Sequence, residues 1–254
     1  MLGLGNNIAR SSFVSVSGQW SIGFDGADDA VLAPDGDAVI GTGGSYENIT
    51  IATWFRTHTS STEQQLISFR KTNTTSTNLG ILLNKNDSDF PAVGNIGILT
   101  YNGSSHLRIT YDASTDDNRW IHFAAVVTTN NVKLYIDGSE VVDASATPSF
   151  DNQFNDEPIT IGARFAGDSS FAGEIADLAL YDAALTSGNI STIYNSRAFY
   201  DHASGVGSSD LQAWYRMGDG TEAGAGSTLY DMSSNSHNAT LYSGAYFNFF
   251  SSAM

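Results

Sequence analysis

Cysteine is absent from this chain of 254 residues, and proline occurs only four times. The lack of cysteine excludes disulfide bonds and thiol nucleophiles. No G-x-S-x-G motif offers a serine nucleophile, and the five histidines show no paired spacing such as H-E-x-x-H. The sequence therefore supplies no candidate for nucleophilic catalysis and no histidine-based metal centre.

Basic residues are also few. The chain has 11 Lys and Arg against 27 Asp and Glu, which gives a formal net charge of −16. A surface this negative repels phosphate backbones, so we expect no nucleic-acid partner. The same charge is compatible with cation binding or with a salty environment.

Long hydrophobic runs are missing. No stretch approaches the ~20 apolar residues that span a bilayer, so we expect no membrane partner. Residues 1–16 lack a charged start followed by a sustained apolar segment, and we therefore expect no cleaved secretory signal. The chain is then expected to be made in the cytoplasm and to leave it, if at all, by another route.

Glycine (25 residues) and aromatic residues (11%) are abundant, as in proteins built from many short strands and tight turns. Short segments with alternating apolar residues, typical of half-buried strands, lie at 20–24, 49–55, 65–69, 80–83, 96–101, 106–111, 159–162 and 173–181. Two later segments, 211–217 and 239–246, also read as strands. The pattern predicts a single all-β domain.

The clearest local unit covers residues 120–142, where two alternating segments meet at Asp137-Gly138, a typical hairpin turn. One short helix is predicted after Thr186, which can cap it, because Ile190, Ile193 and Tyr194 follow at helical spacing.

Four motifs in sequence order resemble those of concanavalin A-like, laminin-G-like jelly rolls. Residues 22–31 resemble their F-D-G-x-D-D-x-V opening, and 120–138 resemble their W-x-H-x-A … L-Y-x-D-G hairpin. Residues 159–177 resemble I-x-I-G … F-x-G-x-I-D, and 184–194 resemble the closing A-L-S … I … L-Y. The resemblance implies a two-sheet antiparallel jelly-roll β-sandwich over residues 20–254, preceded by an N-terminal arm at 1–19.

A fifth motif lies in the tail. Residues 214–220 and 231–241 resemble Y-W-x-x-G-D-G … D-x-S-x-N-x-N-x-T-L, which in most relatives precedes the F-D-G strand. Segment 199–254 could therefore be a permuted piece that completes the sandwich, or the remnant of a second module. This arrangement resembles structural proteins of tailed, especially marine, bacteriophages. It implies a virion protein on capsid or tail, with other virion proteins and host-surface glycans as partners.

Hydrolysis is the alternative activity that this fold family includes, since its β-glucanases carry three acids on one strand face. The nearest string contains Glu174 and Asp177, which stand three residues apart and would point to opposite faces of a regular strand. We therefore predict a non-enzymatic protein. A free calcium-dependent lectin is the main alternative to the virion role, and a β-glucan hydrolase is the weaker one.

One structural Ca²⁺ is implied by the resemblance, because many relatives hold the ion at the sandwich edge with carboxylate, amide and carbonyl oxygens. By family position the candidate ligands are Asp25, Asp28 and Asp177, with Asp231 and Asn235 from the tail motif. The alternative is that these residues only shape turns.

Sugar recognition would use exposed aromatic rings together with polar side chains. Tyr46, Tyr101 and Tyr111 lie near strand ends and are the candidates, whereas the four tryptophans fit core positions of strands. The aromatic end of the chain, residues 246–250, is either a final core strand or a surface for assembly with further copies.

Overall fold

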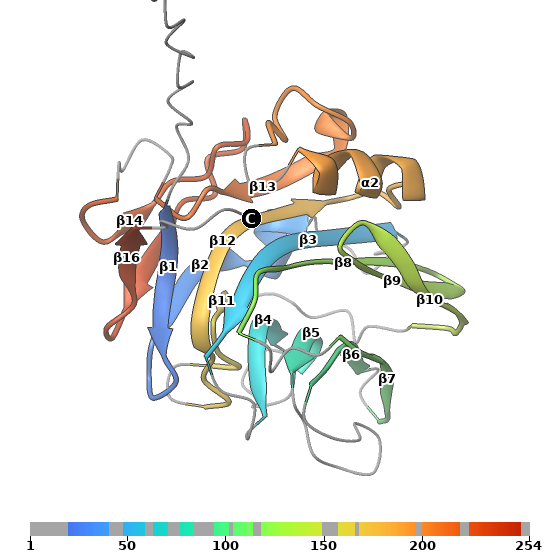
Figure 1. Ribbon diagram of the computed structural model, residues 1–254, viewed down its shortest axis with the longest axis horizontal. Helices are drawn as coiled ribbons and strands as arrows, with labels where there is room; N and C mark the ends of the chain where they lie inside the picture. Colours follow the sequence, from blue (N-terminus) through green and yellow to red (C-terminus); the bar gives the residue numbers. More distant parts are fainter. Residues whose placement is uncertain are drawn as a thin grey trace, which may run out of the picture.

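The computed structural model describes residues 20–40, 48–58, 63–70, 77–83, 94–101, 104–113, 118–148, 157–165, 168–196, 200–218 and 224–249. These residues form two eight-stranded antiparallel sheets that pack face to face (Figure 1). The structure confirms the predicted jelly-roll sandwich. None of the described helices is long and apolar enough to cross a membrane.

The first sheet, sheet A, is built mainly from the middle of the chain. In spatial order its strands are β10 (Ser139–Ser145), β9 (Asn131–Ile136), β8 (Ile121–Thr128), β3 (Asn48–Thr57), β12 (Ala172–Tyr181), β1 (Trp20–Asp25) and β16 (Tyr246–Phe249). The remaining strand, β13 (Leu211–Tyr215), pairs with the end of β12 beyond β1.

The second sheet, sheet B, faces sheet A across the core. Its strands in spatial order are β14 (Thr228–Leu229), β15 (Ala239–Tyr242), β2 (Ala30–Asp35), β11 (Pro158–Ile161), β4 (Gln64–Arg70), β5 (Thr77–Leu83), β6 (Asn95–Tyr101) and β7 (His106–Asp112).

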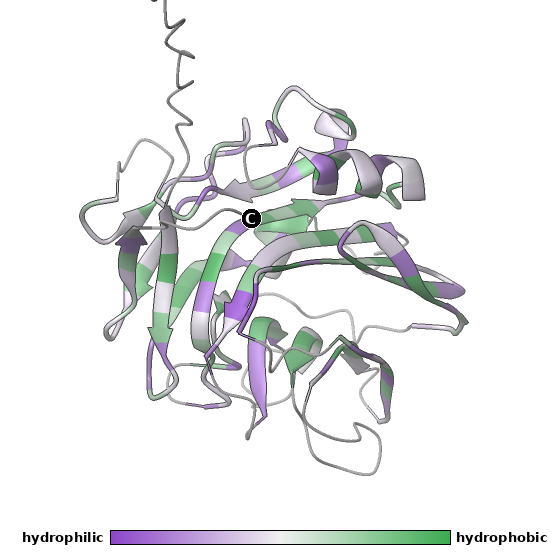
Figure 2. Ribbon diagram, in the orientation of Figure 1, coloured by the Kyte–Doolittle hydropathy of each residue, from purple (hydrophilic) through white to green (hydrophobic). Residues whose placement is uncertain are grey.

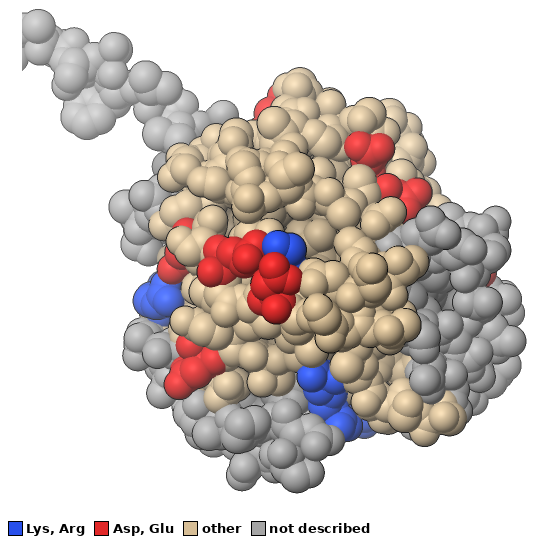
Figure 3. All heavy atoms as spheres, turned by 90° about the vertical axis from the view of Figure 1, so that its right-hand side faces the viewer, with Lys and Arg blue, Asp and Glu red and all other residues tan. Residues whose placement is uncertain are grey.

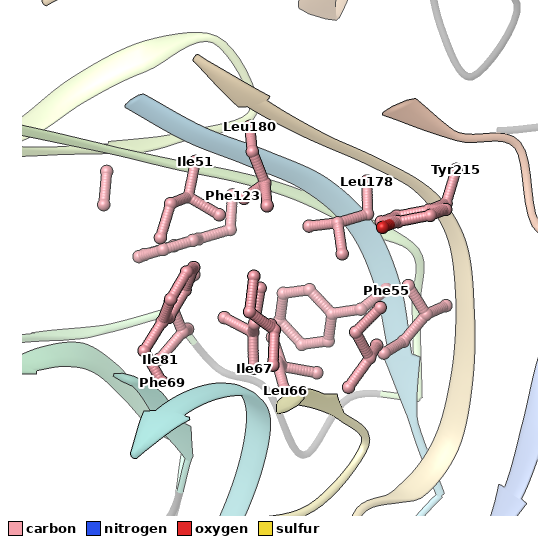
Figure 4. Close-up of a cluster of buried hydrophobic side chains, with 14 of the residues drawn as sticks. Ile51, Phe55, Leu66, Ile67, Phe69, Ile81, Phe123, Leu178, Leu180 and Tyr215 are labelled. Atoms are coloured by element: carbon pink, nitrogen blue, oxygen red, sulfur yellow. The ribbon is translucent and has the colours of Figure 1, made fainter. Parts of the chain in front are cut away.

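The core lies between the inner faces of the sheets, as the alternating strand patterns require. Hydrophobic and hydrophilic bands alternate along β1 and β12 (Figure 2). Phe55 and Phe123 of sheet A meet Ile67 and Phe69 of sheet B in this layer (Figure 4). Burying each such side chain stabilises the fold by about 1.5–3 kcal/mol.

The hairpin between β9 and β10 turns at Asp137-Gly138, as predicted. Both residues have positive φ, 48° and 74°, which is the geometry that closes a two-residue hairpin. A Cβ at Gly138 would lie 2.6 Å from the ring of Tyr194, so the helix that carries this tyrosine packs closely on the turn.

Within the described ranges, two α-helices and one 3₁₀ helix, η3 (Ser208–Asp210), accompany the sheets. The helix α1 (Gly36–Ile40) is one turn long and was not predicted. The helix α2 (Ser187–Asn195) begins at the predicted cap, where Thr186 Oγ1 accepts a hydrogen bond from Asn189 N at 3.2 Å. It covers the outer face of sheet A, opposite β4–β7 (Figure 1).

The C-terminal part of the chain adds strands to both sheets. β13 pairs with β12, β15 with β2, and β16 with β1. Phe247 of β16 packs against the main core, whereas Tyr246 is 52% exposed.

Candidate functional site

A pocket of about 330 Å³ opens on the outer face of sheet A, between the β8–β9 hairpin and the start of α2. We call it the β9–α2 pocket. It is lined by Val126, Thr128, Asn131, Lys133, Tyr135, Ala184, Leu185, Thr186 and Ser187. None of these was singled out as a ligand-binding residue from the sequence.

The alternation of two neighbouring strands creates this lining. Val126 on β8 and Tyr135 on β9 point away from the main core and are 3% and 1% exposed. They form the apolar floor together with Leu185, whose backbone N donates to Thr50 Oγ1 at 3.0 Å. Hydroxyl, amide and ammonium groups form the rim, so the pocket combines an apolar base with polar edges.

Two acidic side chains of β10 contact the lysine of the rim. Lys133 Nζ lies 2.9 Å from Glu140 Oε2 and 2.9 Å from Asp143 Oδ2. Tyr135 donates its hydroxyl hydrogen to Glu140 at 3.1 Å, and Asn131 Nδ2 donates to Asp143 at 2.7 Å. Figure 3 shows acidic atoms gathered around a basic group on the side of the molecule where β8–β10 lie.

The structure brings two of the five predicted metal ligands together. Carboxylate oxygens of Asp25 and Asp28 lie within 4.8 Å of each other and of Asp29, in the loop between β1 and β2. The sequence analysis did not include Asp29. It is 2% exposed, and burial raises its pKa, with smaller contributions from the charges of Asp25 and Asp28.

The other predicted ligands lie elsewhere and are held by protein groups. Asp231 accepts hydrogen bonds from the backbone N of Trp214 and His237, both at 2.9 Å. Asn235 Nδ2 donates to the carbonyl oxygens of Leu211 and Gln212. These contacts fasten the loop after β14 onto β13, so the five residues do not form one site.

Asp177 lies in a buried network on the outer face of sheet A. Its Oδ1 accepts from Trp214 Nε1 at 2.8 Å, and its Oδ2 from His202 Nε2 at 3.0 Å. The hydroxyl of Tyr181 bonds the other ring nitrogen of His202. Burial raises the pKa of Tyr181, and the charge of Asp177 adds to the rise.

The prediction that Glu174 and Asp177 point to opposite faces is wrong. A β-bulge interrupts the pairing of β12 with β3, so that Glu174 pairs with Arg56, Ile175 with Phe55, and Asp177 with Trp54. Both acids therefore face outward. Glu174 is bound by Arg56 at 2.5 Å and by Asn248 at 2.6 Å, so both carboxylates are held by protein partners.

The tyrosines predicted for sugar binding do not converge. Tyr101 ends β6, and its ring lies 4.5 Å from that of His106. Tyr111 is 37% exposed near the far end of the neighbouring strand β7, five residues beyond His106, which is about 17 Å of extended chain. Tyr46 lies outside the described residues.

His122 is the other buried histidine of the outer face and packs beneath α2. Its ring contacts Trp54 and Tyr194 at centroid distances of 5.2 and 5.8 Å. Among the described residues, neither ring nitrogen has a hydrogen-bond partner. Desolvation, with a smaller contribution from His202, lowers its pKa from 6.5 to about 3.

The sandwich, its outer helix and a pocket with an apolar floor define a lectin-like jelly roll. The chain belongs to the concanavalin A-like lectin/glucanases superfamily, whose sequence model matches residues 25–191. Comparison with curated protein sequences gives no match.

Solved structures share the fold at low sequence identity. A candidate carbohydrate-binding protein of Bacteroides ovatus has a TM-score of 0.69 at 15% identity, over 92% of this chain and 61% of that one. A heptameric SAP-like pentraxin of Limulus polyphemus has a TM-score of 0.52 at 17% identity, over 71% and 84% of the two chains. The CBM40 module of a Ruminococcus gnavus sialidase has a TM-score of 0.50 at 13% identity, over 68% and 96%. The present chain thus spans about three fifths of the Bacteroides protein.

Proposed function

We propose that this protein binds carbohydrate and holds a sugar unit in the β9–α2 pocket. The observation that carries this proposal is the pocket itself, in which buried Val126, Tyr135 and Leu185 lie below a polar rim. An apolar base suits the C–H face of a sugar ring, and the rim groups can bond its hydroxyls. The lectin-like fold of the chain supports the same function.

The test is a glycan array with the purified chain, followed by titration of the strongest hit. Ala184 is exposed and lines the pocket, so Ala184→Trp should obstruct it at little cost in folding stability. We expect at least about a tenfold loss of affinity. Ala203→Trp is the matched control, because Ala203 is exposed on a turn that does not line the pocket. Equal affinity of the two variants would contradict the proposed location, and an array without any hit would contradict the function.

We propose further that one Ca²⁺ binds at Asp25, Asp28 and Asp29. Three carboxylates within 4.8 Å suit a hard cation that prefers oxygen ligands, and a bound cation would relieve the repulsion that helps raise the pKa of Asp29.

Calcium at about 100 times its dissociation constant should raise the free energy of unfolding by about 2.7 kcal/mol. Calorimetry should show this gain in wild type and in Asp112→Asn, an exposed acid of β7, and not in Asp28→Asn. A gain that persists in Asp28→Asn would contradict this site.

For the biological setting we propose a non-enzymatic structural or decoration protein of a bacteriophage virion. The order of the sequence motifs supports this role, and so does the formal charge of −16, which suits an exposed particle surface. Mass spectrometry of purified particles should find the chain in amounts similar to other structural proteins. Its absence from particles, with abundant soluble protein in the lysate, would favour a free lectin instead.

We also propose that the chain assembles with copies of itself along the edge of sheet A that ends in β16. No further strand of the described part of the chain pairs with β16 there, and Tyr246 is 52% exposed. Light scattering of wild type and of Tyr246→Lys should show an oligomer and a smaller species, respectively. A wild-type monomer at high concentration would exclude this arrangement.

A further inference from the structure

Negative charges outnumber positive charges in the group of side chains around Lys133 at the β9–α2 pocket. Lys133 is the only cation among the described residues that line the pocket, and two acids of β10, Glu140 and Asp143, each lie 2.9 Å from its ammonium group. One positive and two negative charges give this group a net charge of −1. The rim is therefore weakly acidic even though a lysine lines the pocket.

The rim keeps this charge throughout the neutral pH range. Hydrogen bonds from Lys133 to Glu140 and Asp143 raise the pKa of the lysine, so it stays protonated. Burial, with a contribution from its bond to Glu140, raises the pKa of Tyr135 to about 12, so its hydroxyl stays neutral. Bonds from Asn131 and Lys133 lower the pKa of Asp143, which stays ionised.

Lys133 is consequently a poor receptor for an anion. Two of the three hydrogens of its ammonium group are directed to carboxylates of the protein, which leaves one for a ligand oxygen. A carboxylate bound there would also lie close to Glu140 and Asp143, and like charges at short range repel. A neutral hydroxyl can accept the remaining hydrogen without that repulsion.

We infer that the β9–α2 pocket selects uncharged sugar units and discriminates against sugars that carry a carboxylate, such as sialic and uronic acids. This inference rests on the proposed carbohydrate-binding function and names the ligand class of that same pocket. The inference depends on the side chains around the pocket, because the sandwich fold alone does not determine whether a neutral or an acidic glycan is bound.

The test uses pairs of probes that differ only in charge. Oligogalacturonides with free carboxylates are compared with their methyl esters, and sialyllactose is compared with its carboxyl methyl ester, both on an array. For the best neutral probe, the affinity of its acidic counterpart is then measured by calorimetry at about 0.15 M salt, where exposed charges are partly screened. We expect the neutral member to bind at least about tenfold more tightly, which is 1.4 kcal/mol.

The double variant Glu140→Gln/Asp143→Asn removes both acids from exposed positions of β10. It should bind the acidic probe at least about tenfold more tightly than wild type does, with little change for the neutral probe. The matched control Asp35→Asn/Asp112→Asn removes the same charge from sheet B and should leave the discrimination unchanged. Circular dichroism confirms that each variant is folded.

Each outcome decides a different point. If wild type binds acidic and neutral members equally well, or prefers the acidic member, the inference on ligand class is overturned and carbohydrate binding stands. If the control variant loses discrimination as the rim variant does, the selectivity comes from overall charge, and the role of the rim is overturned. If no glycan of any kind binds, the proposed function fails and the inference fails with it.

Discussion

Acidification from pH 6.5 to about 4.5 is expected to remove about 2 kcal/mol of folding stability through His122 alone. The folded protein holds this imidazole in its neutral form with a pKa of about 3, whereas the unfolded chain takes up the proton near pH 6.5. The unfolded state therefore binds more protons as the pH falls. The contribution is complete above pH 6.5 and is lost progressively toward pH 3.

The measurement is the free energy of unfolding in urea at a series of pH values, for wild type and for His122→Phe. The phenyl ring can keep the contacts with Trp54 and Tyr194, and it cannot be protonated. As the pH falls below 6.5, the free energy of unfolding of wild type should decrease relative to that of His122→Phe by about 1.4 kcal/mol per pH unit. His58→Gln is the control, since the side chain of His58 is 46% exposed. A difference that is constant with pH would show that His122 is protonated in the folded state.

The groups around His122 explain why the proton is excluded. Asp137 is a neighbouring carboxylate, but its Oδ1 accepts from the backbone N of His122 at 3.0 Å, and its Oδ2 accepts from Arg119 at 2.8 Å. The charge of His202 lowers the pKa of His122 in the same direction as burial does. No neighbouring charge thus compensates the imidazolium among the described residues.

Asp177→Ala is expected to lower the free energy of unfolding by about 3–5 kcal/mol. The substitution leaves Trp214 Nε1 and His202 Nε2 without their acceptor, and the carboxylate that it removes is 3% exposed. Buried donors that lose a partner cost more than the bond itself contributes, because they cannot reach water.

Urea unfolding followed by tryptophan fluorescence measures this loss, because the four tryptophans, Trp214 among them, change environment on unfolding. Asp177→Asn is the matched control, since its amide oxygen can still accept one of the two bonds. We expect it to lose less stability than the alanine variant. A loss below about 1 kcal/mol for alanine would show that water or a rearrangement replaces the carboxylate.

Asp177 and the pocket floor are parts of one packed layer. Val126, Tyr135 and Leu185 belong to the same hydrophobic cluster on the outer face of sheet A as Tyr181 and Trp214. The network around Asp177 anchors Trp214 beside this cluster. We therefore expect variants of Asp177 to weaken glycan binding in parallel with stability, whereas Ala184→Trp should weaken binding alone.

Most of the strands could be predicted from local sequence signals, whereas the jelly-roll fold was implied by the resemblance of the motifs. The alternation of apolar residues identified β1, β3, β8, β9 and β12. Successive side chains of a strand point to opposite faces of the sheet, and only one of these faces lies on the main core. The turn at Asp137-Gly138 and the cap at Thr186 depend on nearest neighbours in the chain, and both are present. β2 was missed because four apolar residues are followed by Pro34 and Asp35, so that the strand shows no alternation.

The candidate site could not be predicted in the same way. Lys133 and Tyr135 alternate along β9 with residues of the main core. This alternation puts both side chains on the outer face of sheet A. That a pocket forms there depends on Leu185 and Thr186, about fifty residues later in the chain. Likewise, Asp29 is buried against Gly244, more than two hundred residues away.

The sequence by itself determined the acidic charge, most of the strands and the central hairpin, because these depend on composition, periodicity and short-range turn geometry. Its motifs implied the family and the two-sheet architecture by resemblance. Only the tertiary structure decided which face each acid of β12 occupies, since a single bulge between Ile175 and Asp177 reverses the alternation. It also decided which polar groups meet across β9, β10 and α2. Contacts between segments far apart in the chain leave no periodic signal in either segment, and the site consists of such contacts.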